Sequence, residues 1–329
     1  MVRRLAAAAL VVICGSASAR AGSRHHRKLR SRLLADACPA DSLQHAMPPH
    51  VHYTGKFDIG MRDFVVKDGK WPDNFIFHFY DDAALNASMR ALDAVLELEG
   101  VAGALEAFDA LRPLAFKADL WRYCLIWACG GTYLDSKMQL GLNYGTFLDK
   151  VKNEKVFRDA KDKWDAGGRP GPKPTLITCI DRWVSNLDQY KNISGVWQGL
   201  LIGTRGHPDL LKVIRRVVSN VARRIYPSDE GKLQMLYITG PGTFARETQW
   251  TDPTWQERIH LPCHWGNHGP ELRTVWGSGS LLALMDAGNH EKLRGGPHLS
   301  YGEMYKRYEV YVDGNPTWPP TPQPTKRIT

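Results

Sequence analysis

The residue types best suited to chemistry gather in residues 116–140, which read FKADLWRYCLIWACGGTYLDSKMQL. Asp119 and Arg122 are spaced about one helical turn apart. Asp135 and Lys137 flank a single serine. Carboxylates and a guanidinium make charge-assisted hydrogen bonds with one another and with polar ligands. These residues can therefore form a binding site if the fold brings them together.

The surrounding residues predict how the fold does this. The apolar run predicts a helix that stops at Gly130 and Gly131 and turns directly into a short strand over 132–135. In open α/β sheets, ligands bind beyond the carboxyl ends of the strands. We therefore expect Asp119, Arg122 and Asp135 to converge at one strand end. The alternative is an ordinary surface ion pair, worth about 0.2–0.5 kcal/mol, next to a simple loop.

The rest of the chain predicts an α/β sheet with flanking helices. Short apolar runs bounded by turn residues alternate with segments of helical period, and no internal repeat is present. Asp81 and Asp82 are expected to cap a helix. The expected strands are 50–54, 75–80, 175–180 and 196–203, and the expected helices are 81–98 and 207–225.

Residues 116–137 closely resemble the signature of glycosyltransferase family 32, the DXD sugar-binding-motif family that includes yeast initiating α-1,6-mannosyltransferases. That signature has an acid, an arginine three residues later, a glycine pair, an aromatic residue and Asp-x-Asp. Four further stretches resemble the family in the expected order, namely PPHVHYTGK (48–56), FIFHFYDD (75–82), WQGLLIGTRGHPDL (197–210) and TGPGTFAR (239–246).

The resemblance implies a single GT-A domain that binds a nucleotide sugar and transfers a hexose, with retention, to a hydroxyl acceptor. By residue, Asp119 and Arg122 match the pair that binds the donor sugar, and Asp135 matches the first acid of Asp-x-Asp. Tyr53, just past the first strand, is a candidate for stacking on the base, with a core position as the alternative. The expected partners are a UDP- or GDP-hexose and a glycan, glycolipid or glycoprotein acceptor.

Lys137 departs from the family pattern because it stands where the second aspartate belongs. That acid is the usual ligand of Mn²⁺ or Mg²⁺, and an ammonium group cannot ligate a cation. The metal is therefore in doubt: it is either lost or held by Asp135 with a residue of the later CHWGNHG loop, His264 or His268. If the metal is lost, we expect Lys137 to lie near the donor diphosphate.

Two other functions remain open at this point. The lysine is compatible with a degenerate relative that binds a nucleotide sugar or glycan without transferring it. A glycoside hydrolase would also use paired carboxylates. Such a hydrolase needs no arginine at the strand end, which favours the transferase.

The N-terminus predicts entry into the secretory pathway. A cationic start, an apolar run from Leu5 to Cys14 and a small-residue site at Ala19 are typical of a signal peptide, with an uncleaved membrane anchor as the alternative. The body is then expected in the Golgi lumen or outside the cell, where Asn86 and Asn192 fit as glycosylation sites. The expected segments are the signal (1–19), a basic stem (20–46), the transferase domain (47–313) and a proline-rich tail (314–329).

Charge and cysteine content narrow the remaining classes. The net charge of +9 comes almost wholly from eight cations in residues 3–32, so the body is nearly neutral. This favours a tether beside a membrane over a nucleic-acid partner.

Loss of Cys14 with the signal leaves an odd number of cysteines, so at least one must stay unpaired in a monomer. Cys124 and Cys129 lie on different sides of one expected helix, which disfavours a bridge between them.

Overall fold

The computed structural model describes residues 25–55, 70–136, 138–169, 172–181, 195–226, 234–249, 252, 254–265, 271–274, 281–285, 301–307 and 309–312. Its helices are η1 (Ala40–Gln44), α3 (Asp82–Leu98), α4 (Ala104–Ala110), α5 (Leu114–Cys129), α6 (Tyr144–Asn153), α7 (Lys155–Ala166), α8 (Pro208–Ala222), η3 (Gln234–Tyr237), α9 (Pro241–Gln249), η4 (Trp255–Glu257) and α11 (Tyr301–Lys306). Its strands are β1 (His50–Thr54), β2 (Ile76–Tyr80), β3 (Gly131–Leu134), β4 (Met138–Leu140), β5 (Leu176–Ile180), β6 (Val196–Gly203), β7 (Ile259–Trp265), β8 (Glu271–Thr274) and β9 (Leu281–Met285).

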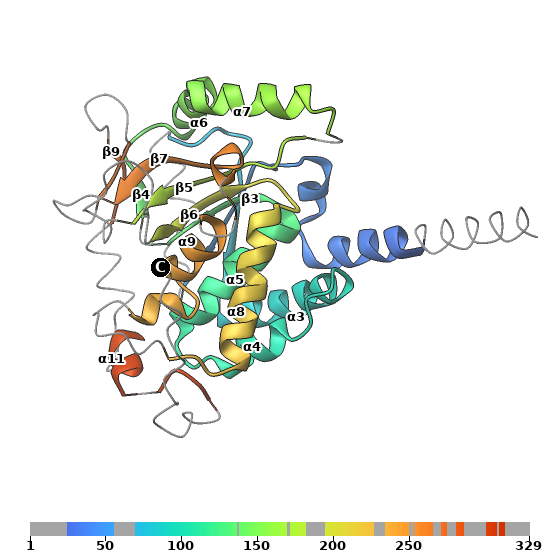
Figure 1. The fold of residues 1–329 in the computed structure, drawn as a ribbon, viewed down its shortest axis with the longest axis vertical. Helices are drawn as coiled ribbons and strands as arrows, with labels where there is room; N and C mark the ends of the chain where they lie inside the picture. Colours follow the sequence, from blue (N-terminus) through green and yellow to red (C-terminus); the bar gives the residue numbers. More distant parts are fainter. Residues whose placement is uncertain are drawn as a thin grey trace, which may run out of the picture.

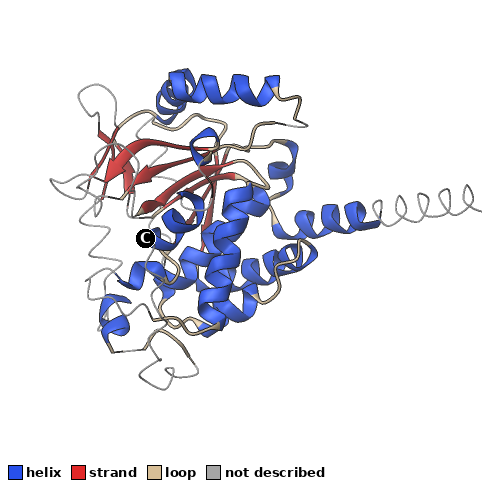
Figure 2. Cartoon of the chain, viewed as in Figure 1, coloured by secondary structure: helices blue, strands red, loops and turns tan. Residues whose placement is uncertain are grey.

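The described strands form one mixed sheet in the order β2-β1-β3-β6-β5-β7-β8-β9-β4. β1 pairs in parallel with β2 and β3, whereas β6 runs antiparallel to both β3 and β5. Helices α3, α4, α5 and α8 lie on one side of the sheet, and α6 and α7 lie on the other (Figure 1). The helices and the single sheet are distinguished by colour in Figure 2. The predicted α/β class with layered helices is confirmed.

The sheet separates two hydrophobic clusters. The larger one lies between the sheet and α3, α5 and α8, and it includes Leu92, Trp121 and Val217. The smaller one lies under α6 and includes Leu134 and Phe147. α5 is buried over most of its surface, so the polar groups that it carries must find partners inside the protein.

The predicted elements agree closely with those observed. β1 and β6 have the predicted bounds, and β2 and β5 each begin one residue later. α3 begins where the two acids predicted it, since the side chain of Asp81 accepts a hydrogen bond from the backbone N–H of Ala84 at 2.8 Å. The helix predicted over 207–225 is shorter at both ends as α8.

Part of the predicted stem packs on the body. Residues 25–37 are helical, and Leu34 and Cys38 are buried in the larger cluster. A disulfide joins Cys38 to Cys129 at the end of α5, and a second joins Cys179 to Cys263. Cys124 is a buried free thiol, so the predicted absence of a bridge to Cys129 is confirmed. Within the described ranges, no helix has both the length and the apolar character of a membrane span.

Candidate functional site

The turn between α5 and β3 brings the site together. Gly130 and Gly131 have φ angles of 73° and 94°, which residues with a side chain rarely adopt. A Cβ on either glycine would also lie 2.9 Å from a backbone oxygen, that of Ala46 or His50. The glycine pair therefore lets β3 return beside the helix. As a result, Asp135 reaches the turn of α5 that carries Arg122.

Arg122 is the centre of the site. Its Nη1 donates to Asp135 Oδ1 at 3.2 Å and to the carbonyl of Gln198 at 2.9 Å, and its Nη2 lies 3.4 Å from Asp119 Oδ1. Its Nε donates to the carbonyl of Ala118 at 3.1 Å. The three charged residues predicted from sequence are thus joined through one guanidinium.

Burial and charge oppose each other at Arg122. Burial alone would lower the pKa of the guanidinium, but its interactions with Tyr133, Asp135 and Asp119 outweigh this effect and raise the pKa above its usual value. The side chains of Arg122, Asp119 and Asp135 are 9%, 14% and 18% exposed. The cluster is therefore shallow, with the two carboxylates closer to solvent than the cation. A polar ligand at this surface could reach both carboxylates, with the arginine packed behind them.

Tyr133 completes the support of Asp135 and was missed from the sequence. Its hydroxyl donates to Asp135 Oδ1 at 2.7 Å, and the Arg122 guanidinium lies over its ring, 4.4 Å from the centroid. Burial raises the pKa of this hydroxyl well above its usual value, so it stays a neutral donor. Strand alternation gives a usable signal, because residues two apart on a strand face the same side of the sheet.

Asp119 has a second partner far along the chain. The hydroxyl of Thr239 donates to Asp119 Oδ2 at 2.9 Å. The carbonyl of Thr239 accepts from the hydroxyl of Tyr123, which is also in contact with the side-chain amide of Gln198. The segment before α9, identified from sequence only as part of a family resemblance, therefore contacts the site directly.

Of the other predicted site residues, the structure describes Tyr53 and His264. Tyr53 is 2% exposed and packs against Phe79, with ring centroids 5.4 Å apart. It therefore occupies the core position left open as the alternative, and the prediction that it stacks on a base is not supported. Lys137 and His268 lie outside the described residues, as does Asn192. His264 lies on β7 opposite Arg273 of β8, and no described contact joins it to Asp135.

The contacts of Asp135 oppose a metal ion at its Oδ1 atom. Asp135 Oδ1 already accepts from Arg122 and Tyr133, and the guanidinium would repel a cation at the same carboxylate. Over the described ranges, no group of three histidine, cysteine or acidic side chains has a metal-binding arrangement.

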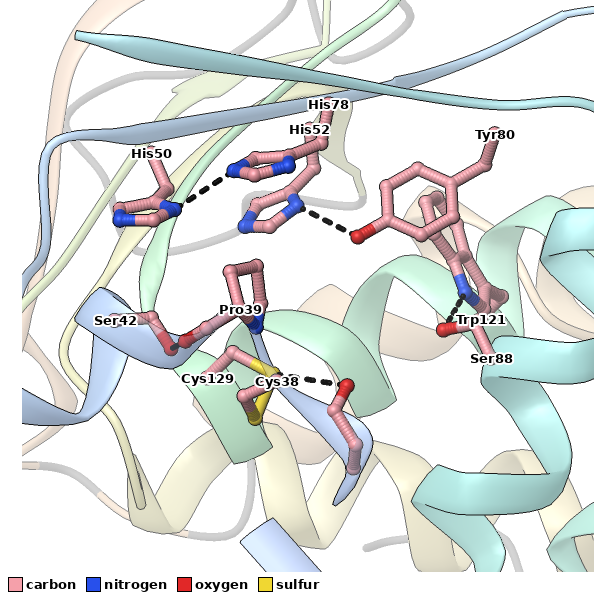
Figure 3. The surroundings of a disulfide bond; sticks show 11 residues. Cys38, Pro39, Ser42, His50, His52, His78, Tyr80, Ser88, Trp121 and Cys129 are labelled. Carbon is pink, nitrogen blue, oxygen red and sulfur yellow. Dashed lines mark hydrogen bonds between the residues drawn. A yellow bond between two sulfur atoms is a disulfide. The ribbon is translucent and has the colours of Figure 1, made fainter. Parts of the chain in front are cut away.

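A second cluster of titratable groups, the histidine stack, consists of His50, His52 and His78. The ring of His78 lies 4.9 Å from that of His50 and 5.1 Å from that of His52, and both pairs are stacked (Figure 3). His50 Nδ1 is 2.8 Å from His78 Nε2, and His52 Nδ1 is 3.2 Å from the hydroxyl of Tyr80. The segment with Pro39 and the Cys38–Cys129 disulfide lies next to these rings (Figure 3).

The surroundings of the histidine stack favour neutral imidazole rings. Burial is the main reason that the pKa of each ring is lowered, to about 4 for His78, and each ring that is protonated would repel its neighbours. The Nε2 atoms of His50 and His52 are buried and have no hydrogen-bond partner. The stack adjoins the site around Arg122 through the sheet, because His52 on β1 is the register partner of Tyr133 on β3.

Comparison with known proteins gives only distant likenesses. No family model and no curated protein matches the chain. Among solved structures, the PaToxG glycosyltransferase is 12% identical, with a TM-score of 0.37 and coverage of 70% of this chain and 79% of that one. Mouse xyloside xylosyltransferase 1 is 10% identical, with a TM-score of 0.31 and the same coverages. The glycosyltransferase domain of the YGT toxin is 12% identical, with a TM-score of 0.24, and covers 54% of this chain and 41% of its own. All three TM-scores are below 0.5, so the proposal below is argued from this chain's own residues.

Proposed function

We propose that this chain is a glycosyltransferase of the GT-A type that moves a hexose from a nucleoside diphosphate to a hydroxyl of a glycan, glycolipid or glycoprotein, with retention. The observation that carries the proposal is the convergence of Asp119, Arg122 and Asp135 at the carboxyl end of β3. The resemblance of residues 116–137 to the signature of glycosyltransferase family 32 supports it.

The chemistry of the cluster suits a sugar nucleotide. In the transfer, the bond between the anomeric carbon and the diphosphate breaks, a bond to the acceptor oxygen forms, and the proton of the acceptor hydroxyl passes to the departing diphosphate. Ionised carboxylates accept hydrogen bonds from sugar hydroxyls, which orients the ring. Arg122 keeps both acids ionised and fixes their positions, since it is buried behind them. This arrangement argues against a glycoside hydrolase, whose general acid must be protonated.

We further propose that the transfer needs no metal ion. Asp135 is engaged by Arg122 and Tyr133. In the sequence, Lys137 replaces the acid that would complete a metal site. An ammonium near the diphosphate would stabilise the negative charge that develops on the leaving group, as a metal ion does in other enzymes.

We place the enzyme in the secretory pathway, in the Golgi lumen or secreted. The apolar N-terminus and the two disulfides support this location, because disulfides persist in oxidising compartments. The N-terminus would associate the enzyme with the membrane if it is not cleaved.

A panel of UDP- and GDP-hexoses tests the proposal. A donor at a hundred times its dissociation constant should stabilise the fold by about 2.7 kcal/mol, which a thermal shift detects. Release of the nucleoside diphosphate, with transfer to water or an added sugar acceptor, should follow for the same donor. Absence of both stabilisation and turnover over the whole panel would reject a transferase.

The second candidate is a binding protein that has lost the reaction, which the replacement of an acid by Lys137 favours. It predicts a saturable thermal shift with a sugar nucleotide and no release of the diphosphate under any condition. The same panel therefore separates the two functions.

A further inference from the structure

The segment before α9 is held unusually firmly against the site. The side-chain amide of Asn220, on α8, donates to two consecutive carbonyls, those of Tyr237 at 3.2 Å and Ile238 at 3.0 Å. The hydroxyl of Tyr123 donates to the next carbonyl, that of Thr239, at 3.2 Å. Three backbone carbonyls in a row are thus bound by two buried side chains. The backbone of Thr239 is therefore fixed relative to α5 and α8.

The side chain of Thr239 uses this fixed position to contact Asp119. It is fully buried, and its hydroxyl donates to Asp119 Oδ2 at 2.9 Å, while Asp119 Oδ1 lies 3.4 Å from Arg122 Nη2. One carboxylate oxygen is thus directed toward the arginine and the other toward the threonine. These two contacts constrain the orientation of the Asp119 carboxylate.

We propose that Thr239 is a positioning residue for Asp119, and that the segment before α9 sets the geometry in which Asp119 meets the donor sugar. The proposal rests on the proposed function. Thr239 acts through Asp119, because its hydroxyl donates a hydrogen bond to the carboxylate and so holds one rotamer. A donor to a carboxylate also favours the ionised form of the acid.

The neighbouring residue Thr243 provides a matched control. It lies on α9, it is 1% exposed, and its hydroxyl is buried with no hydrogen-bond partner. Thr239→Val and Thr243→Val therefore remove the same atom from two equally buried positions. Only the first change removes a hydrogen bond.

The experiment compares the full secreted chain with T239V, T239A, T239S and T243V. With the best hexose donor, T239V and T239A should lose about 10-fold to 100-fold in kcat/KM, the scale of a hydrogen bond to a charged group. T239S should keep most of the activity because it retains the hydroxyl. T243V should match the unmodified protein. The acid limb of the pH–rate profile should move to higher pH in T239V and T239A only.

A titration that needs no turnover separates this inference from the proposed function. With ¹³C-labelled aspartate, the carboxyl signal that disappears in Asp119→Asn reports on Asp119. Its midpoint should move upward in T239V and T239A and stay in place in T239S and T243V. An unchanged midpoint in folded T239V and T239A overturns the inference even if no donor is ever found. Equal loss of activity in T239S and T239V overturns it as well, since shape rather than the hydroxyl would then matter.

Discussion

Arg122 and Asp135 lie 3.2 Å apart, although the first is inside a buried helix and the second follows a strand. The glycine pair between them converts a separation of 13 residues into a direct contact. The ion pair of Arg122 and Asp135 is therefore both a part of the candidate site and a link between α5 and the sheet. Changes at its two members should differ in how they affect stability and binding.

Replacing Arg122 with alanine should reduce stability and binding together. The change removes the cation that pairs with both carboxylates and the donor to the carbonyl of Gln198, and breaking a buried ion pair typically costs about 3–5 kcal/mol. Urea unfolding should show this loss, and donor binding should disappear. Arg112→Ala is the control, because Arg112 is an exposed arginine. A stable Arg122→Ala protein with normal donor affinity would remove Arg122 from the site.

Asp135→Asn should separate binding from folding. The amide keeps the shape of the side chain and can still accept from Tyr133, so the loss of stability should be about 1–3 kcal/mol. The negative charge is lost, and turnover should fall by about 100-fold or more. Asp159→Asn on the exposed surface of α7 is the matched change. Equal turnover in the two variants would contradict the role given to Asp135.

The contacts that were predictable from the sequence are the local ones. Arg122 and Asp135 are separated by a helix end and a two-glycine turn, and the residue types predict both features. The contact of Tyr133 with Asp135 was equally predictable, since Tyr133 lies two residues before Asp135 and strand residues two apart face the same side.

The distant contacts had no such signal. Thr239 lies 120 residues from Asp119, and nothing in the sequence states which loop reaches the strand end. The histidine stack depends on the parallel register that places His52 opposite His78. The sequence left Tyr53 open between a core position and a stacking one, because a tyrosine near a strand end looks the same whether its ring faces the core or a ligand.

Turnover should persist in EDTA. A divalent ion about 4 Å from the Lys137 ammonium would experience a repulsion of roughly 8 kcal/mol at an effective dielectric constant near 20. If the ammonium replaces the metal at the diphosphate, Lys137→Ala should lose activity. Lys137→Asp should be active only with added Mn²⁺. The measurement is diphosphate release with and without chelator. Loss of activity in EDTA that Mn²⁺ restores in the unmodified protein would show that a metal is used.

The number of free thiols should report how the N-terminus is processed. The two disulfides account for four cysteines, and Cys124 is free and buried. A thiol titration of the denatured, unreduced protein from a eukaryotic host should therefore give one thiol if the signal with Cys14 is removed and two if it is retained. The mass of the intact chain provides an independent check. We expect one thiol, and two would favour the membrane anchor.

Stability should fall in mild acid because of the histidine stack. The pKa of His78 is about 4 in the folded protein, mainly through burial and then through His50, against 6.5 for an ordinary histidine. A pKa lowered by folding means that the unfolded chain binds the proton more tightly. The stability from this histidine is therefore fully present above pH 6.5 and is lost as the pH falls toward 4. For His78, which is partly exposed, the loss is about 2 kcal/mol after discounting for solvent screening.

His78→Gln should reduce this acid sensitivity. Glutamine still offers a neutral hydrogen-bonding group to His50 but cannot take up a proton, so the free energy of unfolding should change less between pH 7 and pH 4.5 than in the unmodified protein. His45→Gln is the comparison variant, since His45 is exposed and lowers the pKa of His50 only by repulsion. The negative charge of Asp41 favours protonation of His50 and so weakens the effect without reversing it. If His78→Gln and His45→Gln show the same pH dependence as the unmodified chain, the acid sensitivity arises elsewhere.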